Sequence, residues 1–541
     1  MYLLVPPPRE PAAEGETMEE QGFWNRAQLH PERLALADPL GREWTRGELL
    51  AECNRITSGL RALGVEHGDT VAIAAPNCAE FYQLYLAVAQ AGIYLTPINW
   101  HLAPAEIAFI VQDCGAKAFL AHEKIAEACV AAADQIDFPA AARFAVGNVP
   151  GFRPLEELKA MGAPEMPADR APGAVMNYTS GTTGNPKGVK RALAPKELDP
   201  GIMGELMGGF LGMFGVQAED DNVHLVGSPL YHTAVLMHSA SSLQMGHVVV
   251  LMDKWLPEGM LDLIEKYRVT LSHMVPTQFN RLLLLPEDVR AKYDCSSTRT
   301  MIHAAAPCPP EIKRRMMEWW GNSIWEYYAA TEGGGTICSP EQWLENPGTV
   351  GTAWAGAEIR IVDDETGQPV EQGEQGTIYM KLPENMAFEY KGDAAKTKKS
   401  RLEIDGALYF TVGDIGFLNE RNFLFLCDRK IDMIISGGAN IYPAEIENVL
   451  TSHPSVGDVA VFGIPNDDWG EEIKAVIEPA PGIEPGDSLR DEVLAFCTDK
   501  LAKFKLPKSI DFTDEMPRDP NGKLYKRKLR DPYWEGQSRT I

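Results

Sequence analysis

The stretch Tyr178–Val189 reads YTSGTTGNPKGV and combines three glycines, four serine and threonine hydroxyls and one lysine. The apolar residues 174–176 run into it and are expected to end a buried strand. Glycines allow backbone conformations closed to other residues, so consecutive N–H groups can turn towards one anion. The stretch therefore predicts a phosphate loop, with candidate contacts from Thr179, Ser180, Gly181, Thr182, Thr183, Gly184 and Lys187.

Two other interpretations of this phosphate loop are less well supported. It is not a Walker A loop, because Pro186 stands where that pattern needs its last glycine and no serine or threonine follows Lys187. A plain surface turn is the remaining alternative, since runs of glycine, serine and threonine commonly form turns. Motifs further along the chain favour phosphate binding over a turn.

Length and composition place the chain among globular proteins with a large core. Its 541 residues correspond to roughly three or four domain-sized units, and 45% of them are hydrophobic. The formal net charge of -26 disfavours nucleic acids and anionic membrane surfaces as partners. Nine cysteines without paired spacing predict reduced thiols in the cytoplasm rather than a disulfide framework or a zinc site.

Two segments need separate interpretation. Residues 1–21 contain prolines and glutamates but no long apolar run, so we expect a flexible lead-in and not a signal peptide. Residues 201–216 are the most apolar, but Glu205 interrupts them and they are shorter than a membrane crossing. No integral membrane segment is expected; a core helix is favoured over a pocket-lining segment.

Strand-like and helix-like stretches alternate along most of the chain, which predicts α/β sheets covered by helices on both faces. Strands are expected at 70–75, 93–97, 117–121, 222–226, 247–251, 271–275, 300–303 and 323–327, and helices at 43–60, 81–91, 104–114, 256–267 and 310–320. Open sheets of this kind bind ligands beyond the carboxyl ends of their strands.

The alternation of strand-like and helix-like stretches ends near residue 350. Short stretches at 358–362 and 376–382, separated by a turn, predict antiparallel strands of a small β-rich subdomain at 350–410. A new α/β segment follows. We therefore expect a large N-terminal portion, 22–429, with two doubly covered sheets plus this subdomain, and a smaller C-terminal α+β domain at 430–541.

Six further motifs follow the phosphate loop in order. They are PLYHTA at 229–234, HAAAP at 303–307, YYAATEG at 327–333, YFTVGD at 409–414, SGGANIYPAE at 436–445 and PRDPNGKL at 517–524. Five of them have an ordinary alternative: His232 as a structural histidine, Glu332 as a solvated carboxylate, Asp414 as a turn cap, residues 436–445 as a plain turn ahead of a helix, and Lys523 as a solvated lysine. The ordered set is far more specific than any member.

Together these motifs resemble the adenylate-forming superfamily, which includes acyl-CoA synthetases (fatty-acid–CoA ligases), stand-alone adenylation domains and luciferase. The resemblance extends from Trp44 to Arg530. It implies that residues 179–187 embrace the β- and γ-phosphates of ATP. It also implies nucleotide contacts from Ala305, Ala306 and Pro307 in an adenine loop, Tyr328 stacked on adenine, Thr331 at the α-phosphate, Asp414 at the ribose hydroxyls, and Arg429 at ribose and phosphate.

The resemblance also assigns the catalytic roles. Lys523 matches the lysine that bridges the attacking carboxylate and the α-phosphate, and Glu332 supplies an oxygen ligand for Mg²⁺. His232 lies beside the acyl carboxylate and the thiol route. Acyl-pocket candidates are His232, Val235, Leu236 and Met274, all apolar apart from the histidine.

Two departures from the family pattern are visible. Many members have glycine where this chain has Ala304 or Ala305, so acyl specificity does not carry over from relatives. The hinge before the C-terminal domain is usually Asp or Lys, but here it is Ile431, with Asp432 next. The resemblance implies that the C-terminal domain is mobile and that Gly437 and Gly438 line the pantetheine tunnel. Lys505 and Arg527, in a basic run, are candidate CoA contacts, with a solvated face as the alternative.

The expected function is an AMP-forming carboxylic acid–CoA ligase that acts on an apolar acyl or aryl acid. The alternative is an adenylating enzyme that loads a carrier protein or another acceptor; the residues after His232 lack the aspartate that amino-acid-activating members use. A non-catalytic nucleotide-binding regulator is disfavoured by Glu332, Asp414, Arg429 and Lys523. Expected partners are small molecules, namely the acid, ATP and CoA, and a homodimer is a further expectation.

Overall fold

The computed structural model describes residues 21–179, 186–218, 221–330, 332–381, 389–390, 394–518, 522 and 524–535. These residues fall into two compact units, one formed by Tyr2–His273 with Pro383–Lys399 and the other by Met274–Leu382 with Ser400–Ile541. The units divide at 273/274, so the domain limits expected at 429/430 stay a prediction.

The first unit contains a six-stranded, all-parallel sheet in the order β7-β6-β5-β3-β4-β8. Its strands are β3 Thr70–Ala74, β4 Tyr94–Ile98, β5 Ala116–His122, β6 Arg143–Val146, β7 Arg153–Pro154 and β8 Ala174–Val175. The three strands predicted at 70–75, 93–97 and 117–121 are confirmed to within two residues. Their continuous apolar sequences reflect burial on both faces.

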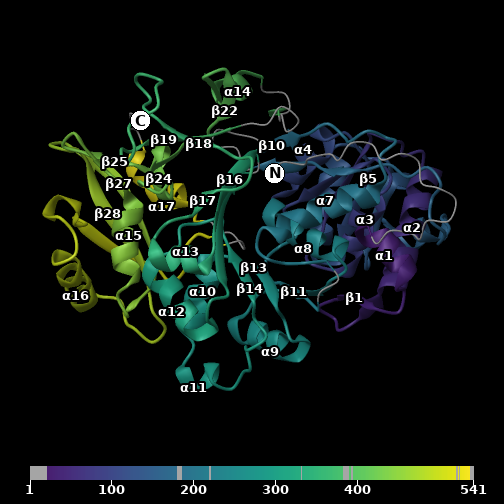
Figure 1. Cartoon of the computed structure of the whole chain (residues 1–541), viewed down its shortest axis with the longest axis horizontal. Helices are drawn as coiled ribbons and strands as arrows, with labels where there is room; N and C mark the ends of the chain where they lie inside the picture. The colour runs from purple at the N-terminus through teal and green to yellow at the C-terminus, as the bar shows by residue number, and fades with distance from the viewer. Residues whose placement is uncertain are drawn as a thin grey trace. The chain divides into compact units, whose positions relative to one another are not determined.

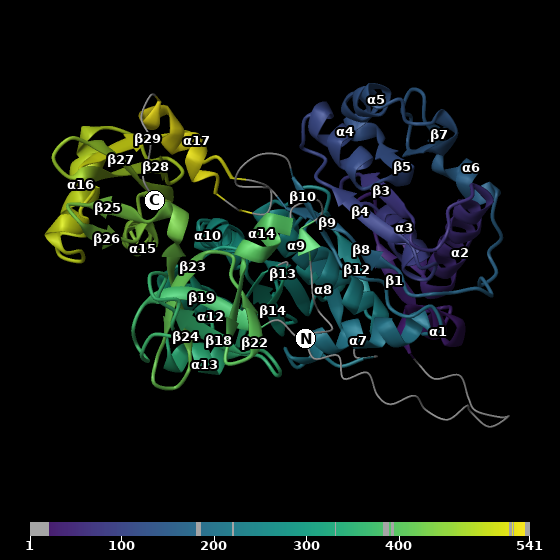
Figure 2. The ribbon, with the colours of Figure 1, turned by 90° about the horizontal axis from the view of Figure 1, so that it is seen from above.

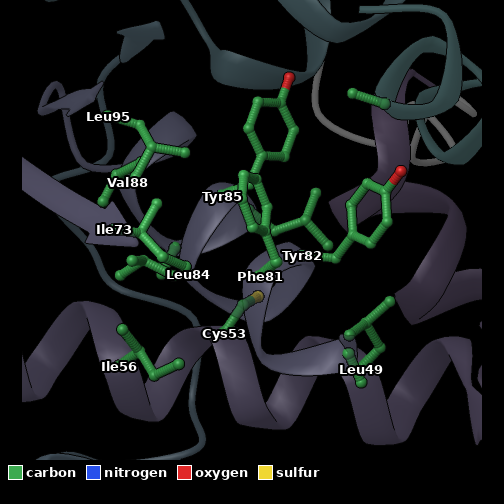
Figure 3. Packing of buried hydrophobic residues seen from close by; sticks show 14 of the residues in the cluster. Leu49, Cys53, Ile56, Ile73, Phe81, Tyr82, Leu84, Tyr85, Val88 and Leu95 are labelled. Atoms are coloured by element: carbon green, nitrogen blue, oxygen red, sulfur yellow. The ribbon is translucent and has the colours of Figure 1, made fainter. Parts of the chain in front are cut away.

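Alternate residues of β3 show how this sheet is covered. Val71 and Ile73 belong to one core, which they share with helices α2 (Arg46–Ala62) and α3 (Ala79–Ala89). Ala72 and Ala74 belong to another core, shared with α4 (Pro104–Asp113) and α5 (Ala126–Gln135). Figure 3 shows the first of these cores, where side chains from α2, α3, β3 and β4 converge. The predicted doubly covered sheet is confirmed.

A second run of paired strands in this unit has the order β13-β11-β12-β1-β2 and is part of a longer sheet. It comprises β1 Leu34–Ala37, β2 Glu43–Thr45, β11 Val223–Val226, β12 Val248–Leu251 and β13 Leu271–Met274, with helices α1 Gly22–Leu29, α6 Leu155–Ala160, α7 Pro200–Gly212, α8 Thr233–Gln244 and α9 Pro257–Tyr267 elsewhere in the unit. The apolar stretch at 201–216 is a helix, as expected, and it ends at Gly212.

The helix predicted at 43–60 starts three residues later than expected. Glu43–Thr45 forms β2, and Thr45 is the N-cap of α2. The Thr45 hydroxyl accepts from the Glu48 N–H, and the Glu48 carboxylate accepts from the Thr45 N–H. This capping box satisfies two backbone donors that a helix would otherwise leave open at its start.

The second unit begins with strands β14 Thr300–His303, β15 Ile324–Ala330, β16 Gly333–Cys338 and β17 Thr352–Ala353, and helices α10 Pro276–Leu283, α11 Glu287–Arg290, α12 Pro310–Trp320 and α13 Pro340–Glu345. Strands β14 and β15 are parallel, whereas β15, β16 and β17 pair antiparallel. The bounds of β14 and α12 are those predicted (Figure 1).

The predicted antiparallel strands after residue 350 are present. The sheet has the order β21-β22-β19-β23-β24, and β18 pairs with β19. Its strands are β18 Ile359–Val362, β19 Gly376–Lys381, β21 Arg401–Ile404, β22 Ala407–Phe410, β23 Asp414–Leu418 and β24 Leu424–Arg429. The sheet therefore continues beyond residue 410 to Arg429, and helix α14 (Ala394–Lys399) interrupts the strand pattern in sequence.

The C-terminal part is an α+β fold (Figure 2). Strands β25 Ile434–Ser436, β26 Ala439–Ile441, β27 Val456–Asn466, β28 Gly470–Pro479 and β29 Ser509–Phe512 accompany helices α15 Pro443–Thr451, α16 Asp487–Thr498 and α17 Lys526–Arg530. Val459 and Val461 of β27 face a core that includes residues of α15 and α16. Ala460 and Phe462 face a smaller cluster on the other side.

Among the described residues, none of the helices combines the length and the apolar character needed to cross a membrane. The nine cysteines all lie in described parts of the chain, and none forms a disulfide.

We expect Phe81→Ala to lower the free energy of unfolding of the first unit by about 3–5 kcal/mol, because the fully buried ring would leave a cavity. Urea titration followed by circular dichroism measures the change. Leu40→Ala is the control, since Leu40 is 79% exposed and should change the free energy by no more than about 0.5 kcal/mol. Equal effects of the two substitutions would contradict the assignment of the core.

Candidate active site

The phosphate loop connects two strands of a hairpin. Thr179 ends β9 (Asn177–Thr179) and lies opposite Lys187, which begins β10 (Lys187–Lys190); β20 (Glu389–Tyr390) pairs with the other side of β10. The intervening candidates Ser180, Gly181, Thr182, Thr183 and Gly184 lie outside the described residues, so their roles stay predictions.

The base of this hairpin is anchored by Tyr178. Its hydroxyl donates a hydrogen bond to the Asp113 carboxylate at the end of α4. Burial and the neighbouring carboxylate raise the pKa of Tyr178 above its ordinary value, so the hydroxyl remains protonated and continues to donate. The phosphate loop thus begins from a strand whose position is fixed.

His232 lies at the N-terminus of α8, at the end of a loop held by a residue that sequence reasoning missed. The Asn77 amide donates to the carbonyls of Ser228 and Met252 at 3.0 Å each, and its oxygen accepts from the Leu230 N–H at 2.9 Å. Asn77 follows β3 at its carboxyl end, where polar side chains of parallel sheets commonly serve ligand sites. Its position just after β3 was the feature of the sequence that could have identified Asn77 as a candidate.

Helix α8 has one buried face and one more accessible face. Val235 and Leu236 are only 2% exposed and belong to the hydrophobic core. Thr233, Ala234 and Met237 are partly exposed, and residues four apart lie on the same helix face. Val235 and Leu236 therefore pack α8 against the hydrophobic core. A role for them in the acyl pocket stays a prediction. Met237, which sequence reasoning did not single out, lies on the accessible face.

Tyr328, Asp414 and Arg429 lie together in the second unit. The Tyr328 hydroxyl donates to Asp414 Oδ2 at 2.7 Å, and Arg429 Nε lies 3.4 Å from Asp414 Oδ1. Asp414 and Arg429 face each other across the antiparallel pair β23–β24. Burial, followed by the charge of Asp414, raises the pKa of Tyr328 well above its ordinary value. Three residues expected at adenine and ribose are thus within direct contact.

Glu332 occupies the turn between β15 and β16, while the neighbouring Thr331 lies outside the described residues. Two glycines after it are required by close packing. A Cβ on Gly334 would lie 2.8 Å from the Met380 side chain, and one on Gly335 would lie 2.3 Å from the Tyr328 carbonyl. The turn therefore packs closely against Met380 and the Tyr328 backbone, and this packing holds Glu332 close to Tyr328.

The adenine loop, 303–307, contains backbone strain. Ala305 has φ +71°, in the left-handed region that non-glycine residues rarely adopt. The Ala304 N–H donates to the Met274 carbonyl at 3.4 Å, which brings the acyl-pocket candidate Met274 against this loop. Ala306 is half-buried and Pro307 is exposed. Of the two positions where the family resemblance implies glycine in many members, Ala304 and Ala305, only Ala305 has the conformation that glycine favours.

The C-terminal candidates are distributed over several turns. Ile431 is half-exposed in the short 3₁₀ turn Lys430–Asp432, and Lys430 forms an ion pair of 2.7 Å with Asp364. Gly437 has φ +58° and its N–H donates to the Trp469 carbonyl at 2.8 Å. Gly438, which follows it, has φ +80°. The hinge and tunnel roles stay predictions.

Lys505 and Arg527 differ in their availability for a ligand. Lys505 Nζ contacts both oxygens of Glu445, at 2.7 and 2.6 Å. Arg527 is exposed on α17. A CoA contact from Lys505 would compete with this ion pair, whereas Arg527 remains accessible.

Lys523 lies outside the described residues, but its neighbour Gly522 is held tightly. The Arg518 guanidinium donates to the Gly522 carbonyl at 2.6 Å and makes two hydrogen bonds to Asp458, at 2.6 and 2.8 Å. Arg518 also forms an isolated β-bridge with Leu524. Sequence reasoning missed this anchoring pair, because its members are sixty residues apart.

The described residues contain no cluster of three or more histidine, cysteine or acidic side chains that could bind a metal ion by themselves. Glu332, 7% exposed, offers one carboxylate. Mg²⁺ commonly binds one or two protein carboxylates and takes water and substrate phosphate oxygens as its other ligands. The residues present therefore fit a Mg²⁺ ion that arrives with a nucleotide.

Family models and curated relatives match most of this chain. Residues 23–390 match the family model described as AMP-binding enzyme, and residues 445–523 match the AMP-binding enzyme C-terminal domain. A feruloyl-CoA synthase from an Amycolatopsis species is 33% identical, over 94% of this chain and 98% of its own. The fatty acid–[acyl-carrier-protein] ligase ScoC of Streptomyces coeruleorubidus is 31% identical, over 93% and 94% respectively.

Solved structures show the same fold. The o-succinylbenzoate CoA synthetase of Bacillus subtilis, in complex with its acyl-adenylate intermediate, superposes with a TM-score of 0.74 at 28% identity. The match covers 96% of this chain and 99% of that protein. Both the large N-terminal part and the smaller C-terminal part are included.

We expect Ala305→Gly to raise the free energy of unfolding by about 0.5–1 kcal/mol, because relief of the left-handed strain outweighs the added flexibility of the unfolded chain. Ala304→Gly is the matched control; its residue is buried without positive φ, so stability should fall by about 0.4–1 kcal/mol. Thermal denaturation of both variants measures the difference. A lower midpoint for Ala305→Gly would contradict the strain argument.

Proposed function

Because the chain belongs to the AMP-binding enzyme family of the adenylate-forming superfamily, we propose that it is an ATP-dependent carboxylic acid–CoA ligase that releases AMP and pyrophosphate. The observation that carries the proposal is the contact group Tyr328–Asp414–Arg429. It combines an aromatic ring for a base, a carboxylate for two ribose hydroxyls and a guanidinium for phosphate or ribose oxygens.

In the first half-reaction, the substrate carboxylate attacks the α-phosphorus of ATP and displaces pyrophosphate. The phosphate loop, with Lys187, holds the β- and γ-phosphates, and Thr331 donates to the α-phosphate. Lys523 places its ammonium between the carboxylate and the α-phosphate, where negative charge accumulates. Glu332 would hold a Mg²⁺ ion that arrives with the nucleotide, and that ion would supply charge neutralisation at the phosphates. Orientation and charge stabilisation account for most of the acceleration.

In the second half-reaction, the CoA thiolate attacks the carbonyl carbon of the acyl-adenylate and AMP leaves. His232 lies at the thiol route, and Gly437 and Gly438 line the pantetheine path after the C-terminal domain turns about Ile431. Arg527, and Lys505 once released from Glu445, contact the CoA phosphates. A lysine suits the first step because its flexible stem can be withdrawn for the second.

The substrate is proposed to be an apolar acyl or aryl acid. The accessible face of α8 carries Thr233, Ala234 and Met237, and the buried Met274 backs the adenine loop. None of these four side chains, which the structure describes, is charged, and this supports an acid without a second ionic group. The reduced cysteines support a cytoplasmic location, and a homodimer stays a prediction.

The alternative acceptor is a carrier protein. It is favoured by one specific observation, the 31% identity to a relative described as a fatty acid–[acyl-carrier-protein] ligase. A carrier presents the same phosphopantetheine thiol as CoA, so both acceptors use the same attack on the acyl-adenylate.

A panel of fatty, alicyclic and aryl acids, each incubated with ATP and Mg²⁺ in the presence or absence of CoA, tests the reaction. We expect AMP and an acyl-CoA from at least one apolar acid, detected by mass spectrometry. Acyl-adenylate that turns over only with a phosphopantetheinylated carrier protein would select the alternative. Release of ADP instead of AMP would exclude both.

We expect Lys523→Ala to reduce ATP–pyrophosphate exchange by about 100-fold or more, because the charge that stabilises the adenylation step is lost. Thioester formation from supplied acyl-adenylate should remain near the wild-type rate. The control is Lys292→Ala, an exposed lysine outside the proposed site, which should leave both reactions unchanged. Equal losses in the two half-reactions would contradict the proposed role of Lys523.

A further inference from the structure

A lysine, a glutamate and a histidine are buried together beneath the adenine loop, and the reaction described above uses none of them. Lys313 Nζ lies 2.7 Å from Glu326 Oε2, and His303 Nε2 lies 3.4 Å from the same oxygen. The side chains of Lys313 and His303 are 0% exposed and that of Glu326 is 8% exposed. We call these three residues the buried triad.

The buried triad joins the elements that position the nucleotide site. His303 ends β14 and is the first residue of the adenine loop, whereas Lys313 lies in the first turns of α12, which follows that loop. Glu326 lies in β15 directly beside His303 in the parallel register. The ion pair with Lys313 therefore ties α12, which follows the adenine loop, to the strand that carries Tyr328, and the neutral His303 ring packs against the same carboxylate oxygen where the loop begins.

Tyr328 follows Glu326 by two residues in β15, so both side chains project from the same face of the strand. The Tyr328 hydroxyl reaches Asp414, which lies opposite Arg429. A shift of Glu326 along or across the sheet would therefore move Tyr328 relative to the adenine loop. The triad is thus connected through β15 to Tyr328 and Asp414, the residues proposed to bind the base and the ribose.

The charges in the triad are balanced. Burial alone would raise the pKa of Glu326, but Lys313 and His303 lower it to about 2, so the carboxylate stays ionised. Burial lowers the pKa of His303, which keeps the imidazole neutral. The neighbours of His303 and Lys313 are aromatic: Phe279 lies 5.3 Å from the His303 ring and Lys313 Nζ lies 5.0 Å above Trp343.

Stability alone does not account for such a group. The cost of removing two charges from water often exceeds their attraction, and apolar residues of similar volume can be equally stable or more so. In some proteins, a buried ion pair restricts the helices and strands that carry it to one arrangement, because any displaced charge would be left unpaired. The adenine loop, with its strained Ala305, is a segment that needs such restraint.

We propose that Lys313, Glu326 and His303 are positioning residues that set the distance between the adenine loop and Tyr328, and thereby the affinity and selectivity for an adenine base. This inference rests on the proposed function, since it assumes that these elements bind the nucleotide. The three residues act through the loop and the strand and do not touch the substrate.

The experiment uses the full chain with the double variant Lys313→Met/Glu326→Leu and the single variant Glu326→Gln. The double variant removes both charges together, so it tests the network even if the single variant, with an unpaired buried lysine, does not fold. The readouts are the Kd for AMP by calorimetry and the ratio of kcat/KM for ATP to that for GTP. We expect the double variant to weaken AMP binding by about tenfold and to reduce the ATP preference by a similar factor, while the KM for the acid stays within about twofold.

The matched control is Lys159→Met/Glu52→Leu, which removes a buried-lysine ion pair of 2.6 Å between α6 and α2. It should leave both nucleotide readouts at wild-type values whatever its effect on the melting temperature. Wild-type AMP affinity and base preference in a folded triad variant would overturn the inference and leave the ligase proposal intact. A wild-type protein that neither binds AMP nor adenylates any acid would overturn both.

Discussion

A β-strand that is buried on both faces gives most of its side chains to hydrophobic cores, so residues that could meet a ligand gather near the strand ends. The residues of β3 alternate between two hydrophobic cores, and the first polar side chain after the strand, Asn77, holds the loop before His232. His303 ends β14 in the same way, and the turn with Glu332 ends β15. Several residues that are expected to meet substrate therefore lie at or just beyond these strand ends.

The site residues are held by different kinds of interaction. Asn77 uses neutral hydrogen bonds to the backbone, which are directional and need no charge nearby. Arg518 and Asp458 form a bidentate ion pair, which fixes both the distance and the orientation of the two side chains. The triad of Lys313, Glu326 and His303 is buried and balanced, so any rearrangement would separate its charges. Each support lies behind a residue that is expected to touch substrate.

The strand and helix pattern was largely predictable, since apolar runs and their periods are local properties. The bounds of β14 and α12 were as expected, and the sheets covered on both faces followed from continuous apolar strands. The start of α2 was predicted three residues too early because Thr45 is both the last residue of β2 and the N-cap of α2. Val235 and Leu236 were chosen for apolar character, which does not distinguish a core-facing residue from one that lines a pocket.

By itself, the sequence determined the family and the order of the motifs, and it predicted the reacting groups, because these depend on residue types at fixed spacings. Only the tertiary structure decided which polar groups meet: Asn77 with the loop before His232, Tyr328 with Asp414, and Lys313 with Glu326. These partners are between 13 and 153 residues apart, and no local pattern relates them. Their contacts arise when packing brings distant strand ends and helix turns together, so they follow from burial in three dimensions and not from the order of residues.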